Sequence, residues 1–522
     1  MRNQPSLLWK ANNTLSRAVG DDVAVGNLDA DPAVEIVSTE FEPNERTGTL
    51  SRVVVRRGDT GVVKWYHEFI HPGISRIALG DIDQDGMQEI VCAVQEEGIF
   101  AFNGDGEILW SHIDTSIQTR FDVGPAIANV LGDTESEVVA PSAEGRLLLL
   151  NSSTGEILWD ADLEDTIESP MGVGDIDGKE GREIVVSCGD HRTYAFSPGN
   201  DTPLWVRSWA EPVEMSAPII ADLNGDADAE VLIANEIEMA VLDGADGHSI
   251  WRHAKSHRGI YFQLPAIGDL DGDGHLEVVF SQDRDVISAL RGHDGSTLWT
   301  FDSGGAEWSK PSIGDFDGDG RDEILVFDTD DSLLALNGED ASVEWSYRIR
   351  DEFVVAQFTP AISDVNNDER LDIVVPCSGS IELYALEPQE SGQYIYWNAR
   401  GGTANYTYTY SLADVDSDFD GLSDSFEQSI GTDISFPDSD GDSMPDAWEH
   451  FNGFDPSDSA VSWEQFLTYN SSLIVLTILG VSTVTIGLII IRSRICTLRK
   501  RGPNEGSSSS ENQSQMVSYG AS

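Results

Sequence analysis

The sequence predicts an all-β fold in which residues 1–410 form one eight-bladed β-propeller of four-stranded blades. Three observations predict it: a short acidic cassette occurs eight times, an apolar strand with a tryptophan follows each cassette, and no ten-residue helical periodicity interrupts this span. Repeats of about 40–50 residues with four short apolar runs are typical of propeller blades, which close into a ring to bury a core.

The acidic cassette has the form Asp-x-Asp-x-Asp-Gly-x-x-Glu and precedes a β-branched run. Its clearest copies are DIDQDGMQEIV at 81–91, DLDGDGHLEVV at 269–279 and DFDGDGRDEIL at 315–325. The eight copies begin at Asn27, Asp81, Asn129, Asp175, Asp222, Asp269, Asp315 and Asp364. Successive copies are 54, 48, 46, 47, 47, 46 and 49 residues apart, so each cassette marks one repeat unit.

Each unit also contains four strand-like runs. In residues 216–255 they are SAPIIADL, AEVLIAN, EMAVLDG and SIWRHAK, separated by turn-forming Gly, Asp and Asn. The fourth run carries Trp65, Trp110, Trp159, Trp205, Trp251, Trp299, Trp345 or Trp397. One further strand, SLLWK with Trp9, precedes the first cassette. We expect this spare strand to close the ring, in competition with the Trp397 strand for the outer position of the last blade.

The alternating oxygen ligands of the cassette suit calcium, which takes six to eight oxygens at flexible geometry. A Gly at the sixth position is expected to supply the positive φ that wraps the loop around the ion. Six copies have oxygen ligands at all four key positions. The expected blade ligands are Asn27, Asp29, Asp31, Glu35, Asp81, Asp83, Asp85, Glu89, Asp222, Asn224, Asp226, Glu230, Asp269, Asp271, Asp273, Glu277, Asp315, Asp317, Asp319, Glu323, Asp364, Asn366, Asp368 and Asp372.

Two copies depart from the ligand pattern. Leu131 occupies the third position of the copy that starts at Asn129, and Lys179 occupies the fifth position of the copy that starts at Asp175. We expect neither to bind calcium, and the ammonium of Lys179 is a candidate to lie in the vacant cation position.

The acidic loop resembles the FG-GAP and VCBS repeat families, whose members are calcium-binding propeller blades like those of integrin α-chain heads. The Gly-to-Trp strand is similar to the quinoprotein, or PQQ-like, repeat. Together these resemblances cover residues 1 to about 410 and imply a calcium-binding propeller. They do not imply one activity, because this architecture hosts adhesins, lectins, lyases and dehydrogenases.

Residues 411–460 form a second acidic segment with EF-hand spacing, in DSDFDGLSDSFE and DSDGDSMPDAWE. The expected ligands are Asp416, Asp418, Asp420, Asp424, Glu427, Asp438, Asp440, Asp442, Asp446 and Glu449. The pair resembles thrombospondin type 3 calcium repeats, which implies a calcium-stiffened stalk. A disordered acidic linker is the alternative.

Residues 473–491 contain no charged side chain and are long enough to cross a membrane as one helix. Basic residues crowd the following tail, 492–522, whereas acidic residues precede the span. The positive-inside rule therefore predicts a single-pass protein of the cell membrane, with a disordered cytoplasmic tail and the propeller outside. Because MRNQPSLLWK contains no apolar h-region, we expect that an export signal is missing from this sequence or that Met1 is not the true start.

The formal charge of −61 makes nucleic acid an unfavourable partner. The sequence has no nucleophile elbow, no zinc-binding His-Glu-x-x-His and no phosphate-binding Gly loop, so we expect a non-enzymatic adhesion or ligand-binding module. Cations and aromatics gather in the links from Trp strands to the next blade, and a glycan or protein ligand is expected at Arg252, Lys255, Arg258, Tyr261 and Phe262. Ordinary solvated loops, a polysaccharide lyase, a quinone-dependent dehydrogenase and an envelope scaffold are the alternatives.

Overall fold

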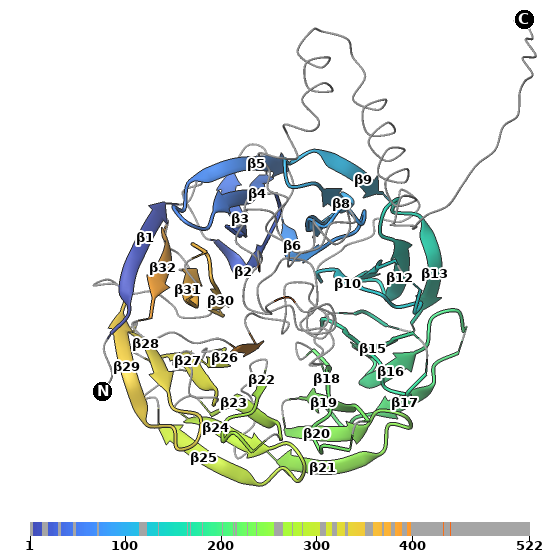
Figure 1. Cartoon of the computed structure of the whole chain (residues 1–522). Helices are drawn as coiled ribbons and strands as arrows, with labels where there is room; N and C mark the ends of the chain where they lie inside the picture. The colour runs from blue at the N-terminus through green and yellow to red at the C-terminus, as the bar shows by residue number, and fades with distance from the viewer. Residues whose placement is uncertain are drawn as a thin grey trace, which may run out of the picture.

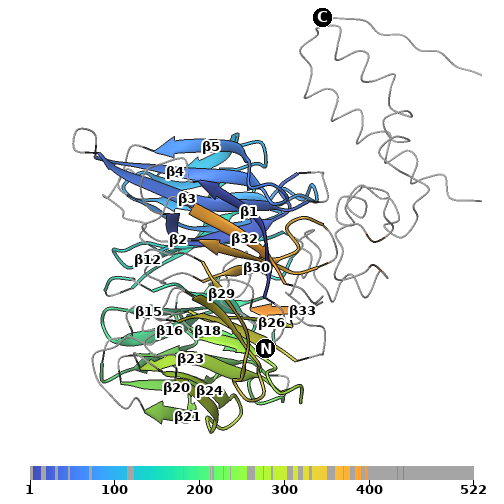
Figure 2. The ribbon, with the colours of Figure 1, turned by 90° about the vertical axis from the view of Figure 1, so that its left-hand side faces the viewer.

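The computed structural model describes 4–12, 19–29, 33–44, 48–69, 73–113, 123–133, 135–163, 165–167, 169–179, 181–200, 202–211, 213, 217–226, 228–235, 237–254, 265–273, 275–283, 286–302, 310–315, 321–328, 332–349, 359–367, 370–376, 382–388, 394–397, 432 and 439. Eight antiparallel sheets radiate from a common axis (Figure 1) and form a disc when seen from the side (Figure 2). The predicted eight-bladed ring of four-stranded blades is therefore confirmed.

Seven blades follow one another along the chain, and the eighth combines both ends of the ring. Blade one contains β2 (Val19–Gly26), β3 (Glu35–Asn44), β4 (Gly48–Arg57) and β5 (Val63–Phe69). Blade two contains β6 (Ile74–Gly80), β7 (Glu89–Val94), β8 (Gly98–Phe102) and β9 (Ile108–His112). Blade three contains β10 (Ala126–Ala128), β11 (Glu137–Pro141), β12 (Arg146–Asn151) and β13 (Ile157–Asp162). Blade four contains β14 (Gly172–Gly174), β15 (Glu183–Cys188), β16 (Arg192–Phe196) and β17 (Trp205–Ser208). Blade five contains β18 (Ile219–Ala221), β19 (Glu230–Ala234), β20 (Glu238–Asp243) and β21 (Ser249–Ala254). Blade six contains β22 (Ala266–Gly268), β23 (Glu277–Asp283), β24 (Val286–Arg291) and β25 (Thr297–Asp302). Blade seven contains β26 (Ser312–Asp315), β27 (Glu323–Phe327), β28 (Ser332–Leu336) and β29 (Val343–Arg348). Blade eight contains β30 (Ala361–Ser363), β31 (Asp372–Pro376), β32 (Glu382–Glu387) and, from the start of the chain, β1 (Ser6–Asn12).

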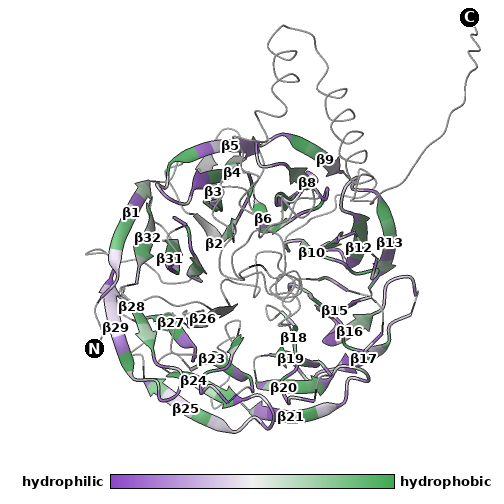
Figure 3. Cartoon of the chain, in the orientation of Figure 1, coloured by the Kyte–Doolittle hydropathy of each residue, from purple (hydrophilic) through white to green (hydrophobic). Residues whose placement is uncertain are grey.

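Burial follows the radial position of each strand. The second strands β7, β11, β15, β19 and β27 are buried along their whole length, because both faces pack against neighbouring blades. For example, Val139 of blade three and Ile184 of blade four belong to one hydrophobic cluster. The outer strands β9 and β21 instead mix exposed and buried residues, and Figure 3 shows the corresponding mixture of hydrophobic and hydrophilic segments along the rim.

The tryptophan of each outer strand explains the second repeated signal in the sequence. The indole N–H of Trp65 in blade one donates to the Gly104 carbonyl in the last turn of blade two, at 2.7 Å. Equivalent bonds join Trp205 to Gly244 at 2.7 Å, Trp251 to Gly292 at 2.6 Å and Trp299 to Gly338 at 2.6 Å. These hydrogen bonds fasten each of the four blades to its successor, whereas the Trp159 indole of blade three has no such partner.

The same turns require glycine beneath the indole ring. Gly106 has a φ of +83°, and a Cβ built there would lie 2.7 Å from the Trp65 ring. A side chain at this place would meet both the backbone penalty of the left-handed region and a steric clash. The Gly-rich turn and the tryptophan are therefore two halves of one contact between neighbouring blades.

Trp9 closes the ring, as its strand was expected to do. β1 is the outer strand of blade eight, where Trp9 pairs with Ala385 of β32, and its indole N–H donates to Gly58 of blade one at 2.6 Å. The expected competition does not arise, because the Trp397 strand lies elsewhere. β33 (Tyr394–Trp397) instead adds a fifth strand to the inner edge of blade seven, next to β26. Trp397 therefore does not belong to the set of outer-strand tryptophans.

Among the described residues every regular element is a strand, and no helix is long and apolar enough to span a membrane. The predicted transmembrane segment, 473–491, the cytoplasmic tail and all expected stalk ligands lie outside the described residues. Cys92 of blade two and Cys188 of blade four are buried free thiols, which pack as small hydrophobic side chains.

We predict that replacing Trp9 with Phe will destabilise the ring more than the same change at Trp159. The Phe ring cannot donate to Gly58, whose carbonyl is buried, whereas the Trp159 indole nitrogen is buried without a hydrogen-bond partner. The difference in the free energy of unfolding should be about 1–2 kcal/mol, measured by denaturant unfolding in excess calcium. Equal losses at the two positions would show that the closing bond contributes nothing.

Candidate metal centres and ligand face

The acidic cassettes form the loops between the first and second strand of each blade, so the eight loops lie on one face of the ring. The carboxylate at the ninth position, the first residue of the second strand, anchors the loop. Its oxygen accepts the backbone N–H of the second loop residue, at 2.9 Å between Glu89 and Ile82 and at 3.1 Å between Glu277 and Leu270. The same bond recurs with Glu35, Glu137, Glu183, Glu230 and Asp372. One carboxylate oxygen thus shapes the loop. The other oxygen is bound by Asn224 in the case of Glu230, at 2.7 Å, and by Lys64 in the case of Glu35, at 2.9 Å.

The first residue of the cassette folds the loop around its own side chain. Asp269 accepts the N–H groups of Gly272 at 2.9 Å and Asp273 at 3.1 Å. The residue with positive φ is the fourth one, at Gly272 and, in blade two, Gln84. The expectation that the sixth-position Gly supplies this conformation is incomplete: Gly86 does have a positive φ, but the tight turn begins two residues earlier.

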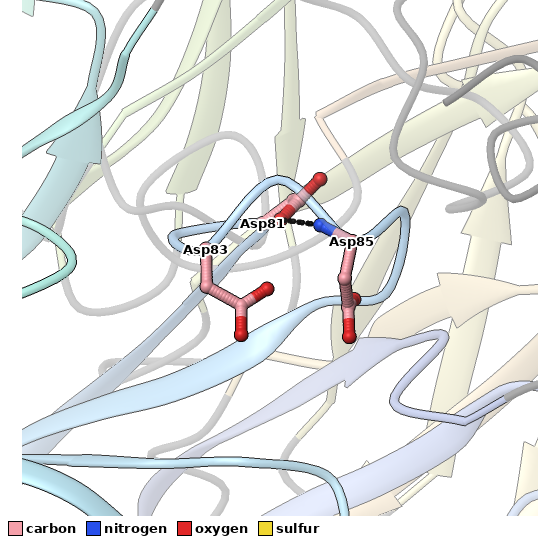
Figure 4. Close-up of side chains that lie close together, drawn as sticks. All are labelled: Asp81, Asp83 and Asp85. Atoms are coloured by element: carbon pink, nitrogen blue, oxygen red, sulfur yellow. Dashed lines mark hydrogen bonds between the residues drawn. The ribbon is translucent and has the colours of Figure 1, made fainter. Parts of the chain in front are cut away.

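Three loops bring carboxylates together within metal-binding range. In blade two, one oxygen each of Asp81, Asp83 and Asp85 lie within 4.8 Å of one another, and Figure 4 shows the three side chains extending from a single loop. The corresponding set in blade six is Asp269, Asp271 and Asp273. In blade four it is Asp175, Asp177 and Glu183.

The third position offers a further sign that a cation fits. The Oδ1 atoms of Asp271 in blade six and Asn366 in blade eight are buried without a hydrogen-bond partner. Buried polar atoms are normally satisfied, and an oxygen that lacks a donor can be satisfied by a metal ion. The all-oxygen donor set matches calcium better than zinc or copper, which prefer nitrogen and sulfur.

The electrostatics of the loops also favour a bound cation. Burial and the neighbouring Asp83 raise the pKa of Glu89 to about 9, and burial with Asp271 and Asp273 nearby raises the pKa of Glu277 to about 8. Burial raises the pKa of Glu230 to about 7. These carboxylates repel one another in a medium of low polarity, and a divalent ion would reverse that repulsion.

Blade one departs from the predicted pattern because it contains its own cation. The ammonium of Lys64, on the outer strand β5, contacts Asp29 and lies 2.9 Å from Oε1 of the buried Glu35. Lys64 therefore lies among the ligands expected for calcium, and both carboxylates favour its charged form. A lysine ammonium and a calcium ion cannot share this position, so the predicted calcium site of blade one is a lysine site in this structure.

The two cassettes that depart from the ligand pattern, in blades three and four, differ in how their loops are arranged. In blade three Leu131 is exposed, and Asn129 accepts the N–H of Gly132 at 2.8 Å within its own loop. In blade four the ammonium of Lys179 contacts Asp177, and the Lys179 side chain is 73% exposed. Asp175, Asp177 and Glu183 of blade four nevertheless lie within metal-binding range of one another. The ligand pattern of the sequence did not predict this.

Several predicted ligands cannot be placed. Among the blade ligands, Asp31, Asp317, Asp319 and Asp368 lie outside the described residues. The described members of those cassettes remain in position: Asp315, Glu323 and Asp372 are buried at the loops of blades seven and eight.

The expected ligand face is opposite the acidic loops, and only part of it can be described. Arg252, near the end of β21, is bound by Glu238 at 3.1 Å. Its guanidinium lies 5.9 Å from the ring centre of Trp209, and that of Arg207 lies 6.0 Å from the same ring. Lys255, Arg258, Tyr261 and Phe262 fall outside the described residues.

Trp209 itself joins blades four and five rather than facing solvent. It is buried, and its indole N–H donates to the Thr193 hydroxyl at 2.9 Å. It therefore positions two arginines at the link between these blades and is not available for stacking on a sugar.

We predict that replacing Lys64 with Met will convert blade one into a calcium-dependent blade. In chelator the change leaves Asp29 and the buried Glu35 without their cation, and we expect a loss of about 2 kcal/mol, below the range of fully buried pairs because Lys64 is partly solvated. Calcium should restore that loss. Lys179→Met, which removes a solvent-exposed pair, is the matched control and should change the melting temperature little. Calcium titrations followed by calorimetry measure both, and a Lys64→Met chain that calcium cannot rescue would contradict the interpretation.

Comparison with known proteins supports the repeat assignment in part. Residues 95–275 match the model of the family described as outer membrane protein assembly factor BamB, and residues 269–326 match that of the FG-GAP-like repeat. No curated protein matches the sequence.

Solved structures give distant likenesses. BamB from Moraxella catarrhalis has 13% identity, a TM-score of 0.48 and coverage of 74% of this chain and 100% of that one. The computationally designed Ika8 protein has 12% identity, a TM-score of 0.49 and coverage of 73% and 100%. The V. cholerae biofilm matrix protein Bap1 has 13% identity, a TM-score of 0.45 and coverage of 85% and 97%. The eight sheets of this chain themselves establish an eight-bladed propeller, and its repeats resemble both BamB-like and FG-GAP-like families.

Proposed function

We propose that this chain is a calcium-binding, non-enzymatic propeller that is displayed on the cell surface and binds a glycan or protein ligand. The observation that carries the calcium part is the convergence of loop carboxylates, together with the partnerless third-position oxygens of Asp271 and Asn366. Calcium would supply a fixed divalent charge that neutralises these groups.

The proposed role of calcium is structural. The loop residues come from the end of the first strand and the start of the second, so one ion would hold the innermost part of a blade together. If free calcium is tenfold above the dissociation constant, each site adds about 1.4 kcal/mol to the free energy of unfolding. Several such sites amount to a large part of the stability of an ordinary domain.

We predict that chelation will lower the melting temperature of the chain and that calcium will restore it. Magnesium at the same concentration should restore less, because it demands a smaller octahedral site. Scanning calorimetry measures the shift. A melting temperature unaffected by chelator would remove the proposed calcium function.

Surface display rests on the composition of the C-terminal part. Residues 411–460 carry EF-hand-like spacing, and residues 473–491 form an uncharged run followed by basic residues. We propose a calcium-stiffened stalk, a membrane-spanning helix and a cytoplasmic tail. Limited proteolysis of the full chain tests the stalk: cleavage within 411–460 should precede cleavage of the ring in chelator and be suppressed by calcium. Equal cleavage in both conditions would favour a disordered linker.

The proposed ligand face is centred on the link between blades five and six and extends to the link between blades four and five. Arg252 and Arg207 flank Trp209 on the described side of this region, and further basic and aromatic residues follow within 255–262. Arginine forks bind carboxylate and sulfate groups, and exposed aromatics stack on sugar rings. An acidic glycan or an acidic peptide is therefore the proposed ligand class.

We predict that Arg252→Ala will weaken ligand binding while Arg146→Ala will not. Arg146 is the matched control because it forms a similar surface pair with Asp160 at 3.0 Å on another blade. A double change of Arg258 and Tyr261 to Ala should remove about 2–4 kcal/mol of binding. A glycan array with the full chain in detergent, with and without calcium, identifies the ligand, and titration with it measures the losses. Unchanged affinity in the Arg252 and double variants would exclude this face, and product formation on the array would favour a lyase.

A further inference from the structure

A buried carboxylate lies at the junction of blades six and seven, outside the ligand positions of the cassette. Asp322 is the eighth residue of the blade-seven loop and has no exposed surface. Neither of its carboxylate oxygens has a hydrogen-bond partner. An isolated buried carboxylate is among the least favourable groups in a protein interior, so its presence requires either a bound proton or a cation.

The carboxylate is directed across the junction toward the acidic loop of blade six. The backbone N–H of Asp322 donates to the carbonyl of Asp269 at 3.3 Å. One carboxylate oxygen lies 2.7 Å from the position that a Cβ on Gly268 would occupy. Gly268 immediately precedes Asp269, so the Asp322 side chain reaches the point where the blade-six cassette begins.

The charged groups that act most strongly on Asp322 are themselves acidic. After burial, they are Asp315 of its own blade, then Asp269 and Glu277 of blade six, and all of them oppose its ionisation. The buried carboxyl group of Asp322 therefore lies where the acidic cassettes of blades six and seven meet. Calcium is bound by carboxylate oxygens of this kind.

The first junction provides a comparison within the same chain. Gln88 holds the equivalent eighth position in blade two, its N–H donates to the Asn27 carbonyl at 2.9 Å, and a Cβ on Gly26 would lie 2.0 Å from its Oε1. Here both polar residues are neutral, and the adjoining loop already contains the ammonium of Lys64. At the sixth junction the corresponding residues, Asp269 and Asp322, are both acidic.

Packing alone does not demand an acid at the eighth position. Apolar residues occupy it in four other blades: Val34, Leu276 and Leu371 are buried, and Ala229 is partly buried. The fold therefore accepts a hydrophobic side chain here, and Asp322 introduces two negative oxygens where a leucine would serve the ring equally well. The acid has a chemical rather than a steric reason to be there.

We propose that Asp322 is a ligand to a calcium ion shared between blades six and seven, with Asp269 and Asp315 as its partners. The inference rests on the proposed calcium function and extends it from ions within blades to an ion that joins two blades. This ion would replace the repulsion among the four carboxylates by attraction across the junction.

The test compares Asp322→Asn with wild type in the full chain. Equilibrium dialysis with radioactive calcium measures the number and affinity of sites, and calorimetry measures the melting temperature with and without chelator. We expect the variant to lose one site or to bind one ion at least about tenfold more weakly, since even outer-shell partners contribute about 10- to 100-fold to metal affinity. In chelator its melting temperature should equal or exceed that of wild type, because the variant lacks one of the mutually repelling acids.

Gln88→Asn is the matched control, because it shortens the equivalent side chain at another junction without changing charge. It should retain the calcium stoichiometry of wild type. If Asp322→Asn also retains the wild-type number and affinity of sites, Asp322 is a protonated acid and the inference is overturned. If wild type itself binds no calcium, the proposed function and this inference fail together. Should the Asn variant not fold, Asp322→Leu, which uses the side chain found at two equivalent positions, serves the same comparison.

Discussion

The bond between the outer-strand tryptophan of one blade and the turn of the next is the interaction on which the ring depends. A blade buries its faces only against its two neighbours, so an open ring would leave two apolar faces in water. β1 pairs with β32 at the outermost position of the last blade, and Trp9 of β1 donates to Gly58 at 2.6 Å, which fastens that blade to the first. Closure therefore brings together residues from the two ends of the propeller, which makes it a contact of high sequence separation.

The acidic loops and the tryptophan hydrogen bonds contribute to the same contact between neighbouring blades. Gly104, whose carbonyl accepts the Trp65 indole, packs so closely on the blade-one loop that a Cβ would lie 1.7 Å from the Leu28 carbonyl. Gly338 stands in the same relation to Trp299 and to Leu270 of blade six. The turn of each following blade thus contacts both the outer tryptophan and the second loop residue of the blade before it. A cation that orders the loop consequently also orders the surface on which the next blade docks.

Most of the fold was predictable because two independent signals repeat with the same period. The cassette and the Trp strand each occur once per blade, and their agreement determined the number of blades. The position of β33 was not predictable: the Trp397 strand has the right spacing for an outer strand, but that edge of β32 is taken by β1. Two strands compatible with one edge can be separated only by the contacts each gains, and β1 gains the bond to Gly58.

The grouping of aspartates in the loops of blades two and six was predictable from the cassette, but the lysine of blade one was not. Lys64 is 35 residues from Asp29 in sequence, and only the sheet of blade one brings them together. A signal was nevertheless present, because the residue before the outer tryptophan is apolar at Leu109, Leu158 and Ile250 but basic at Lys64. Blade one thus meets the repulsion of its carboxylates with a lysine, whereas the loops of blades two and six bring three aspartates together. A lysine neutralises one charge permanently, but a divalent ion neutralises two and can leave. Under the proposed calcium function, propeller blades of otherwise equal architecture would therefore differ in whether their stability follows the calcium concentration.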